Sequence, residues 1–135
     1  MATIKFEGLD EYMAKLRDLG ANIEGTIKAA VYPAAGMVIE AIKENCPAES
    51  GDLRESLALV KYENDNGFVY TKVVFDGYDS KGVPNALKAN VLESGSSTRQ
   101  KHPFIRPAVN RIKAAATMEI ERQLNEIITR KMQEG

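Results

Sequence analysis

The chain contains one cysteine, one histidine and no tryptophan among its 135 residues. A single cysteine cannot form an internal disulfide, and it lacks the second thiol that a Cys-x-x-Cys redox motif or a zinc site requires. We therefore expect the protein to work in a reducing compartment. Cys46 lies just before Pro47, where the apolar face of a predicted helix ends. We expect it to pack as a small hydrophobic side chain rather than to act as a reactive thiol.

The scarcity of catalytic residue types argues against an enzyme. Hydrolytic and transfer enzymes need a positioned base, and the one histidine, His102, lies in a polar stretch beside Pro103 with no obvious nucleophile or orienting carboxylate nearby. The glycines form neither the Walker pattern nor Gly-x-Gly-x-x-Gly, so a phosphate-binding loop is not expected. We predict a protein that is not an enzyme, with no catalytic residue, no cofactor, no metal and no small-molecule substrate.

Neither sign of charge is in excess. The 18 Lys and Arg residues are matched by 19 Asp and Glu residues, which gives a net charge of -1. A balanced chain has no overall field that draws it to nucleic acid or to an anionic membrane. No apolar run approaches the roughly 18 residues that a membrane-spanning helix needs, and Met1 to Leu9 show no basic stretch followed by an apolar one. We expect no membrane contact and synthesis in a cytoplasm.

Residues 96–113 depart from this balance, because they include five cationic side chains and no acidic one. Such a segment can contact an acidic protein surface, remain solvated or bind DNA phosphates. The segment lacks a set of interleaved aromatic residues on which bases could stack. We favour protein contact or solvation, and nucleic-acid binding through this segment stays the alternative function. The cationic residues are Arg99, Lys101, Arg106, Arg111 and Lys113.

The length and the 44% hydrophobic content predict one domain over residues 1–135. Apolar residues recur at three- and four-residue steps in four stretches, which predicts helices. Pro33 lies inside the second stretch and predicts a kink or a restart near Tyr32, because proline removes a backbone donor. The four stretches cover residues 9–19, 23–45, about 84–92 and about 106–132.

Alternating β-branched and aromatic residues predict a hairpin of strands over about 55–62 and 68–76. Asn64 to Gly67 tolerate positive φ and would form its turn. A further edge strand is predicted over 3–7, and Glu49 to Asp52 are expected to form a turn. The predicted fold class is therefore α+β: a small antiparallel sheet packed against two or three long helices.

Two segments resemble one family. Residues 47–57, PAESGDLRESL, are similar to its proline followed by Thr/Ser-Gly-x-Leu-Arg/Lys-x-Ser. Residues 91–96, VLESGS, and 103–108, PFIRPA, resemble its Val-Glu-x-Gly-Thr, variable loop and Pro-Phe-Leu-Arg-Pro-Ala. Order and spacing also agree, and PFIRPA is the most specific piece. The chain thus resembles the gene-ten-type tail-component (neck or tail-completion) proteins of lambdoid siphophages and related prophages.

The resemblance implies a structural protein of the virion, made in the bacterial host cytoplasm and placed in the neck or the head-proximal tail. It implies a ring-forming subunit for head–tail joining or tail termination. The implied partners are other copies of the chain, neighbouring phage neck and tail proteins, and, as an open possibility, DNA passing through the channel.

The same resemblance selects candidate residues. Phe104 is either an anchor between subunits or a core residue at a helix entry, and the sequence leaves both alternatives open. Arg106 offers a planar donor fork near the predicted helix start. The expected partner contacts are Glu93, Gly95, Arg99, Lys101, Phe104 and Arg106, and the expected motif and turn residues are Gly51, Leu53, Arg54, Ser56, Pro103 and Pro107.

Overall fold

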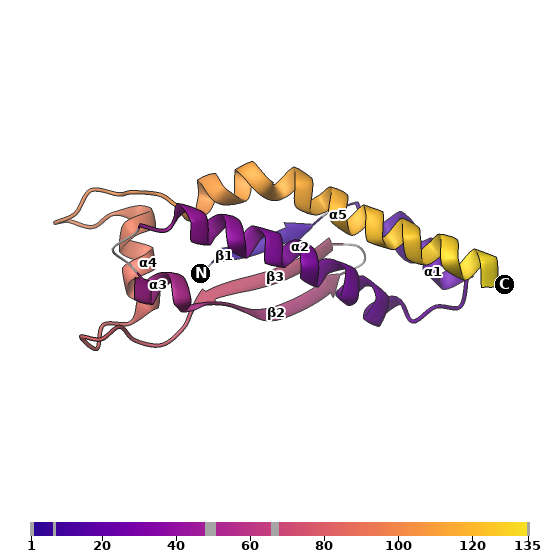
Figure 1. The fold of residues 1–135 in the computed structure, drawn as a ribbon, viewed down its shortest axis with the longest axis horizontal. Helices are drawn as coiled ribbons and strands as arrows, with labels where there is room; N and C mark the ends of the chain where they lie inside the picture. Colours follow the sequence, from indigo (N-terminus) through magenta and orange to yellow (C-terminus); the bar gives the residue numbers. More distant parts are fainter. Residues whose placement is uncertain (1, 7, 48–50, 66–67, 135) are drawn as a thin grey trace.

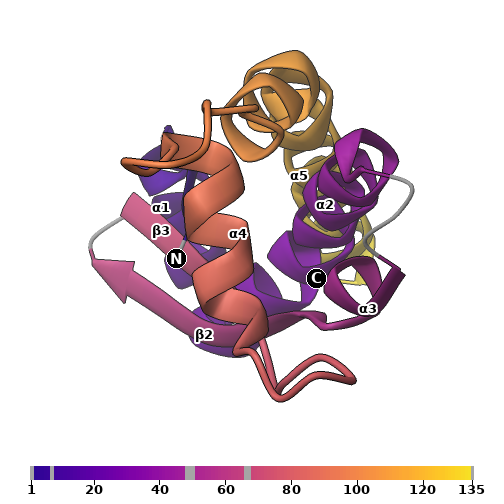
Figure 2. The same cartoon turned by 90° about the vertical axis from the view of Figure 1, so that its left-hand side faces the viewer.

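The computed structural model describes residues 2–6, 8–47, 51–65 and 68–134. Two long helices lie side by side over one face of a small sheet, and a shorter helix lies across one end of it (Figures 1 and 2). The elements follow in the order β1 (Ala2–Phe6), α1 (Asp10–Asp18), α2 (Ile23–Asn45), α3 (Gly51–Glu55), β2 (Leu57–Asp65), β3 (Phe68–Phe75), α4 (Asn85–Ser94) and α5 (Ile105–Glu134).

The sheet has three strands in the order β1-β3-β2, and both outer strands run antiparallel to β3. Thr71 in the central strand pairs with Ile4 on one side and with Tyr62 on the other. The α+β prediction is therefore confirmed, including the hairpin and the edge strand near residues 3–7. Of the predicted hairpin turn, residues 66–67 lie outside the described residues.

The core lies between the sheet and the antiparallel pair α2 and α5 (Figure 1). Many of the contacting side chains on these helices are alanines, which let the two backbones approach closely. Phe6, Leu57 and Phe75 close the core from the sheet side. The buried residues of the two helices are Ile27, Ala30, Val31, Ala34, Ala35, Val38, Ala41 and Ile42 on α2, and Ala108, Ala116, Ile120, Leu124 and Ile128 on α5.

Two local expectations are compared with the structure. Of the two forms expected at Pro33, a kink or a restart near Tyr32, the restart is ruled out, because α2 is continuous across Pro33, whose neighbours on the core face are fully buried. Of the predicted turn over Glu49 to Asp52, residues 49–50 lie outside the described residues, and the second half is wrong, since Gly51 begins α3. That helix has five residues, too few to show a period, and it buries one leucine, Leu53, completely. None of the described helices combines the length and the apolarity needed to cross a bilayer.

Thr71 provides a test of the core. Its side chain is 1% exposed, and its hydroxyl has no hydrogen-bond partner among the described residues. Because an unsatisfied buried hydroxyl is costly, Thr71→Val should raise the free energy of unfolding by about 1 to 3 kcal/mol. Urea denaturation measures the change.

The matched control is Thr117→Val, which removes a hydroxyl that donates to the Lys113 carbonyl at 2.9 Å near the surface of α5. The control should leave the free energy of unfolding unchanged or slightly lower. If Thr71→Val is as destabilising as a cavity mutation, the hydroxyl has a partner and this view of the core is wrong.

Candidate assembly site

The two segments singled out in the sequence meet at one end of the molecule, where α2 ends and α5 begins (Figures 1 and 2). We call this region, formed by residues 51–57 and 91–108, the motif end. The amide of Asn45, in the last turn of α2, donates to the Phe104 carbonyl at 3.3 Å. The end of one long helix is thereby tied to the start of the other.

Glu93, in the last turn of α4, caps the N-terminus of α5. Its Oε1 accepts hydrogen bonds from the backbone N–H groups of Phe104 at 2.8 Å and Ile105 at 2.9 Å, and its Oε2 accepts from the N–H of Arg106 at 3.0 Å. The next residue, Pro107, has no N–H group. One carboxylate therefore satisfies the unpaired donors at the start of α5 and places negative charge at the positive end of its dipole.

Phe104 is 3% exposed and belongs to the core. Its ring meets the ring of Phe75, at the end of β3, edge to face with centroids 5.8 Å apart. Of the two alternatives left open by the sequence, the structure favours the core residue at a helix entry. Within this chain Phe104 fixes the start of α5 to the sheet.

Gly95 ends α4 in a conformation that favours glycine, with φ of 79°. A Cβ at this position would lie 3.1 Å from the Lys101 nitrogen and 3.2 Å from the Arg99 carbonyl oxygen. The connecting loop folds back over this point, since the N–H of Ser96 donates to the Arg99 carbonyl at 2.9 Å and the N–H of His102 to the Leu92 carbonyl at 2.6 Å. Gly95 is thus needed for close backbone approach.

Arg54 closes the C-terminus of α2. Its Nε donates to the Lys43 carbonyl at 3.2 Å and its Nη2 to the Cys46 carbonyl at 3.1 Å. The planar guanidinium matches two carbonyls at once, and its positive charge suits the negative end of the helix dipole. Ser56 ends α3 in turn, because its hydroxyl donates to the Leu53 carbonyl at 2.7 Å.

All of the predicted site residues except Gly51 thus divide into two groups. Glu93, Gly95, Phe104, Leu53, Arg54 and Ser56 join the helix ends to one another and to the sheet. Arg99, Lys101, Pro103, Arg106 and Pro107 are exposed. Gly51 is not a turn residue: it begins α3, and a Cβ placed on it would meet no atom within 4 Å.

A cleft of about 660 Å³ lies beside the Glu93 cap, between α4 and the first turns of α5. Arg106 lies at its rim, together with Asn90 and Asn110. Sequence reasoning did not find this cleft, because it results from the angle between two helices. Its apolar lining comes from Phe75, Ala86, Leu87, Ala89, Ile105 and Val109.

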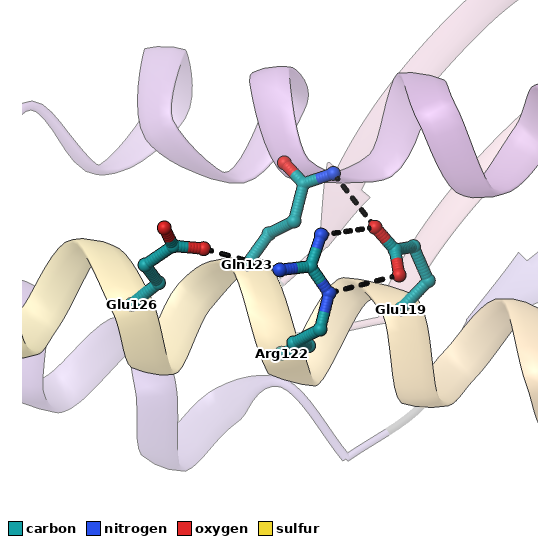
Figure 3. A network of polar contacts seen from close by, with 4 residues as sticks. All are labelled: Glu119, Arg122, Gln123 and Glu126. Atoms are coloured by element: carbon teal, nitrogen blue, oxygen red, sulfur yellow. Dashed lines mark hydrogen bonds and ion pairs between the residues drawn. The ribbon is translucent and has the colours of Figure 1, made fainter.

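A second polar cluster lies farther along α5 (Figure 3). Arg122 bonds Glu119 with Nε at 3.1 Å and Nη2 at 2.7 Å, and it bonds Glu126 at 3.2 Å. Gln123 also donates to Glu119, at 3.1 Å. The hydrogen bond from Arg122 is the main reason why the pKa of Glu119 is lowered to about 2. Spacings of three and four residues on one exposed helix face indicate a stabilising surface network rather than a site.

No three His, Cys, Asp or Glu side chains gather into a possible metal site within the part of the chain that the structure describes. Cys46 is 5% exposed and part of the core, as expected from its place at the end of an apolar face. In comparisons with protein-family models, curated proteins and solved structures, none matches this chain.

Removing the Glu93 carboxylate tests the cap. Glu93→Ala should lower the free energy of unfolding by about 2 kcal/mol, because three N–H groups lose their acceptor. Glu93→Gln keeps one acceptor oxygen, so its free energy of unfolding should lie between those of Glu93→Ala and the native protein. Glu134→Ala, an exposed carboxylate in the last turn of the same helix, is the control and should have little effect. Equal stability of Glu93→Ala and the native chain would contradict the cap.

The Glu119 network predicts a pH dependence. Since the folded pKa lies below the ordinary value of 4.5, the network stabilises the fold above that pH, and its contribution is lost as pH falls toward 2. Glu119→Gln should therefore differ from the native chain in free energy of unfolding near neutral pH and converge with it at acidic pH. Denaturant titrations over this range measure it. Glu121→Gln, on the same helix and outside this network, is the control and should leave the free energy of unfolding near neutral pH unchanged.

Proposed function

We propose that the chain is a structural subunit of a tailed bacteriophage or prophage: a ring-forming neck or tail-completion protein, for head–tail joining or tail termination, that acts through protein contacts. The observation that supports this proposal most is the Glu93 cap. The second segment of the resemblance has two parts, residues 91–96 and 103–108, separated by a variable loop. In the structure Glu93 of the first part binds the backbone of the second part at three points. The quoted motif residues therefore form one physical unit.

The cap also explains how such a subunit would present a contact residue. Arg106 follows the capped N-terminus directly, and its side chain is exposed with no hydrogen bond or ion pair among the described residues. Its backbone is held by Glu93 while its guanidinium stays available to a carboxylate or to carbonyls of a neighbour. The motif thus holds the backbone of Arg106 in place and leaves its guanidinium unpaired within the described part of the chain.

Nucleic-acid binding through 96–113 is the second candidate, and the exposure of Arg99, Lys101 and Arg106 is the observation that favours it. However, Arg111 in the same segment pairs with Glu44 at 3.3 Å, which reduces the free charge. Binding to duplex DNA with a steep dependence on salt concentration would support this candidate over protein contact.

Arg106→Lys tests the assembly role, because lysine keeps the charge but lacks the fork. We expect the melting temperature to stay unchanged, since the side chain makes no hydrogen bond or ion pair within the described residues. We expect infectious tail joining to fall when the variant replaces the native gene. Arg130→Lys, exposed near the other end of α5, is the matched control. If Arg106→Lys leaves both folding and tail joining intact, the contact role of Arg106 is wrong.

The neighbouring genes provide an independent check on the proposal. A neck or tail-completion protein should be encoded beside portal, protease, major capsid and tail-tube proteins. A genomic setting without any virion genes would contradict the proposed function.

A further inference from the structure

The cleft between α4 and α5 is an apolar surface that this chain leaves open. Leu87 on its α4 wall is 53% exposed, and Ile105 and Val109 on its α5 wall are partly exposed. An open groove between two helices, rather than an enclosed cavity, is the form that receives an amphipathic segment of another chain. The volume of about 660 Å³ lies in the range of sites that bury a ligand.

The free charge around this groove is positive. Glu93 also lines it, but both carboxylate oxygens are occupied by the N–H groups that start α5. Arg106 lies at the rim, and Lys113 lies one turn beyond Val109 on the exposed surface of α5. Within the described residues, neither cation has a hydrogen bond or ion pair from its side chain. A partner that fits must bring carboxylates beside its apolar side chains.

We propose that the groove between α4 and α5 binds an acidic amphipathic segment of a different protein, with its apolar side chains against Leu87 and Val109 and its carboxylates on Arg106 and Lys113. The proposal rests on the proposed function only for the source of the segment, which would be a neighbouring neck or tail protein. The amides of Asn90 and Asn110 at the rim supply further donors and acceptors for the backbone or side chains of that segment.

The experiment uses the full chain and a fluorescein-labelled synthetic peptide of about 14 residues, long enough for a helix, with leucine at i, i+3, i+4 and i+7 and glutamate elsewhere. Fluorescence anisotropy should show saturable binding, and amide NMR shifts should change at Leu87 and Val109. The same peptide with lysine in place of glutamate should bind at least about tenfold more weakly, a difference of about 1.4 kcal/mol.

Variants locate the contact. Leu87→Asp changes an exposed side chain, so folding should persist while binding weakens at least about tenfold. Arg106→Glu combined with Lys113→Glu should have the same effect, and Arg130→Glu, the control at the other end of α5, should not. Unfolding melts confirm that each variant is folded.

Three results would overturn the proposal: no saturable binding up to about 1 mM peptide, equal binding of the acidic and basic peptides, or binding that is insensitive to Leu87→Asp. Self-association of the chain that Leu87→Asp abolishes, without peptide binding, would assign the groove to a second copy instead. These measurements use the isolated chain, so their failure is separate from a failure of the tail-joining test.

Discussion

The arrangement of the motif end depends on one carboxylate. Glu93 accepts hydrogen bonds from three backbone N–H groups at the start of α5. The next residue, Pro107, has no N–H group that would need an acceptor. These hydrogen bonds fix α4 to α5. The capped segment includes Phe104, which packs on Phe75 of the sheet. The Phe104 carbonyl also accepts from Asn45 of α2. A single cap therefore sets the positions of four elements at once, and the groove beside it has its shape because the cap holds α4 against α5.

The two long helices run antiparallel, so the motif end collects one helix C-terminus and one helix N-terminus, which have opposite partial charges. Each receives a side chain of the complementary sign from a short neighbouring helix: Arg54 from α3 at the end of α2, and Glu93 from α4 at the start of α5. Neither side chain is free to act as a partner contact without releasing a helix end. Of the residues predicted to contact partners, Arg99, Lys101 and Arg106 are the ones whose side chains are exposed.

Periodicity predicted the long elements well: the helix expected over 23–45 is α2, Ile23–Asn45, and the expected hairpin corresponds to β2 and β3. It could not predict α3, whose five residues span little more than one turn. Glu93, Phe104 and Arg106 were each predicted as site residues, but the hydrogen bonds between them were not predicted. A contact between residues eleven positions apart leaves no local pattern in the sequence. The signal available was Pro107, a residue without an N–H group at the third position of a helix. The role of Phe104 could not be predicted from the sequence, since only the burial of its side chain distinguishes a core residue from an anchor between subunits.

The connection from Ser96 to Lys101 is closed at its base by the hydrogen bonds of Ser96 with Arg99 and of His102 with Leu92. Beneath it, the hydrogen bonds between Glu93 and the start of α5 involve no side chain of this connection. The exposed side chains of this tip can therefore be exchanged at little cost to folding. The surface that the tip exposes can thus change in shape and charge while the helix ends that meet beneath it keep their contacts.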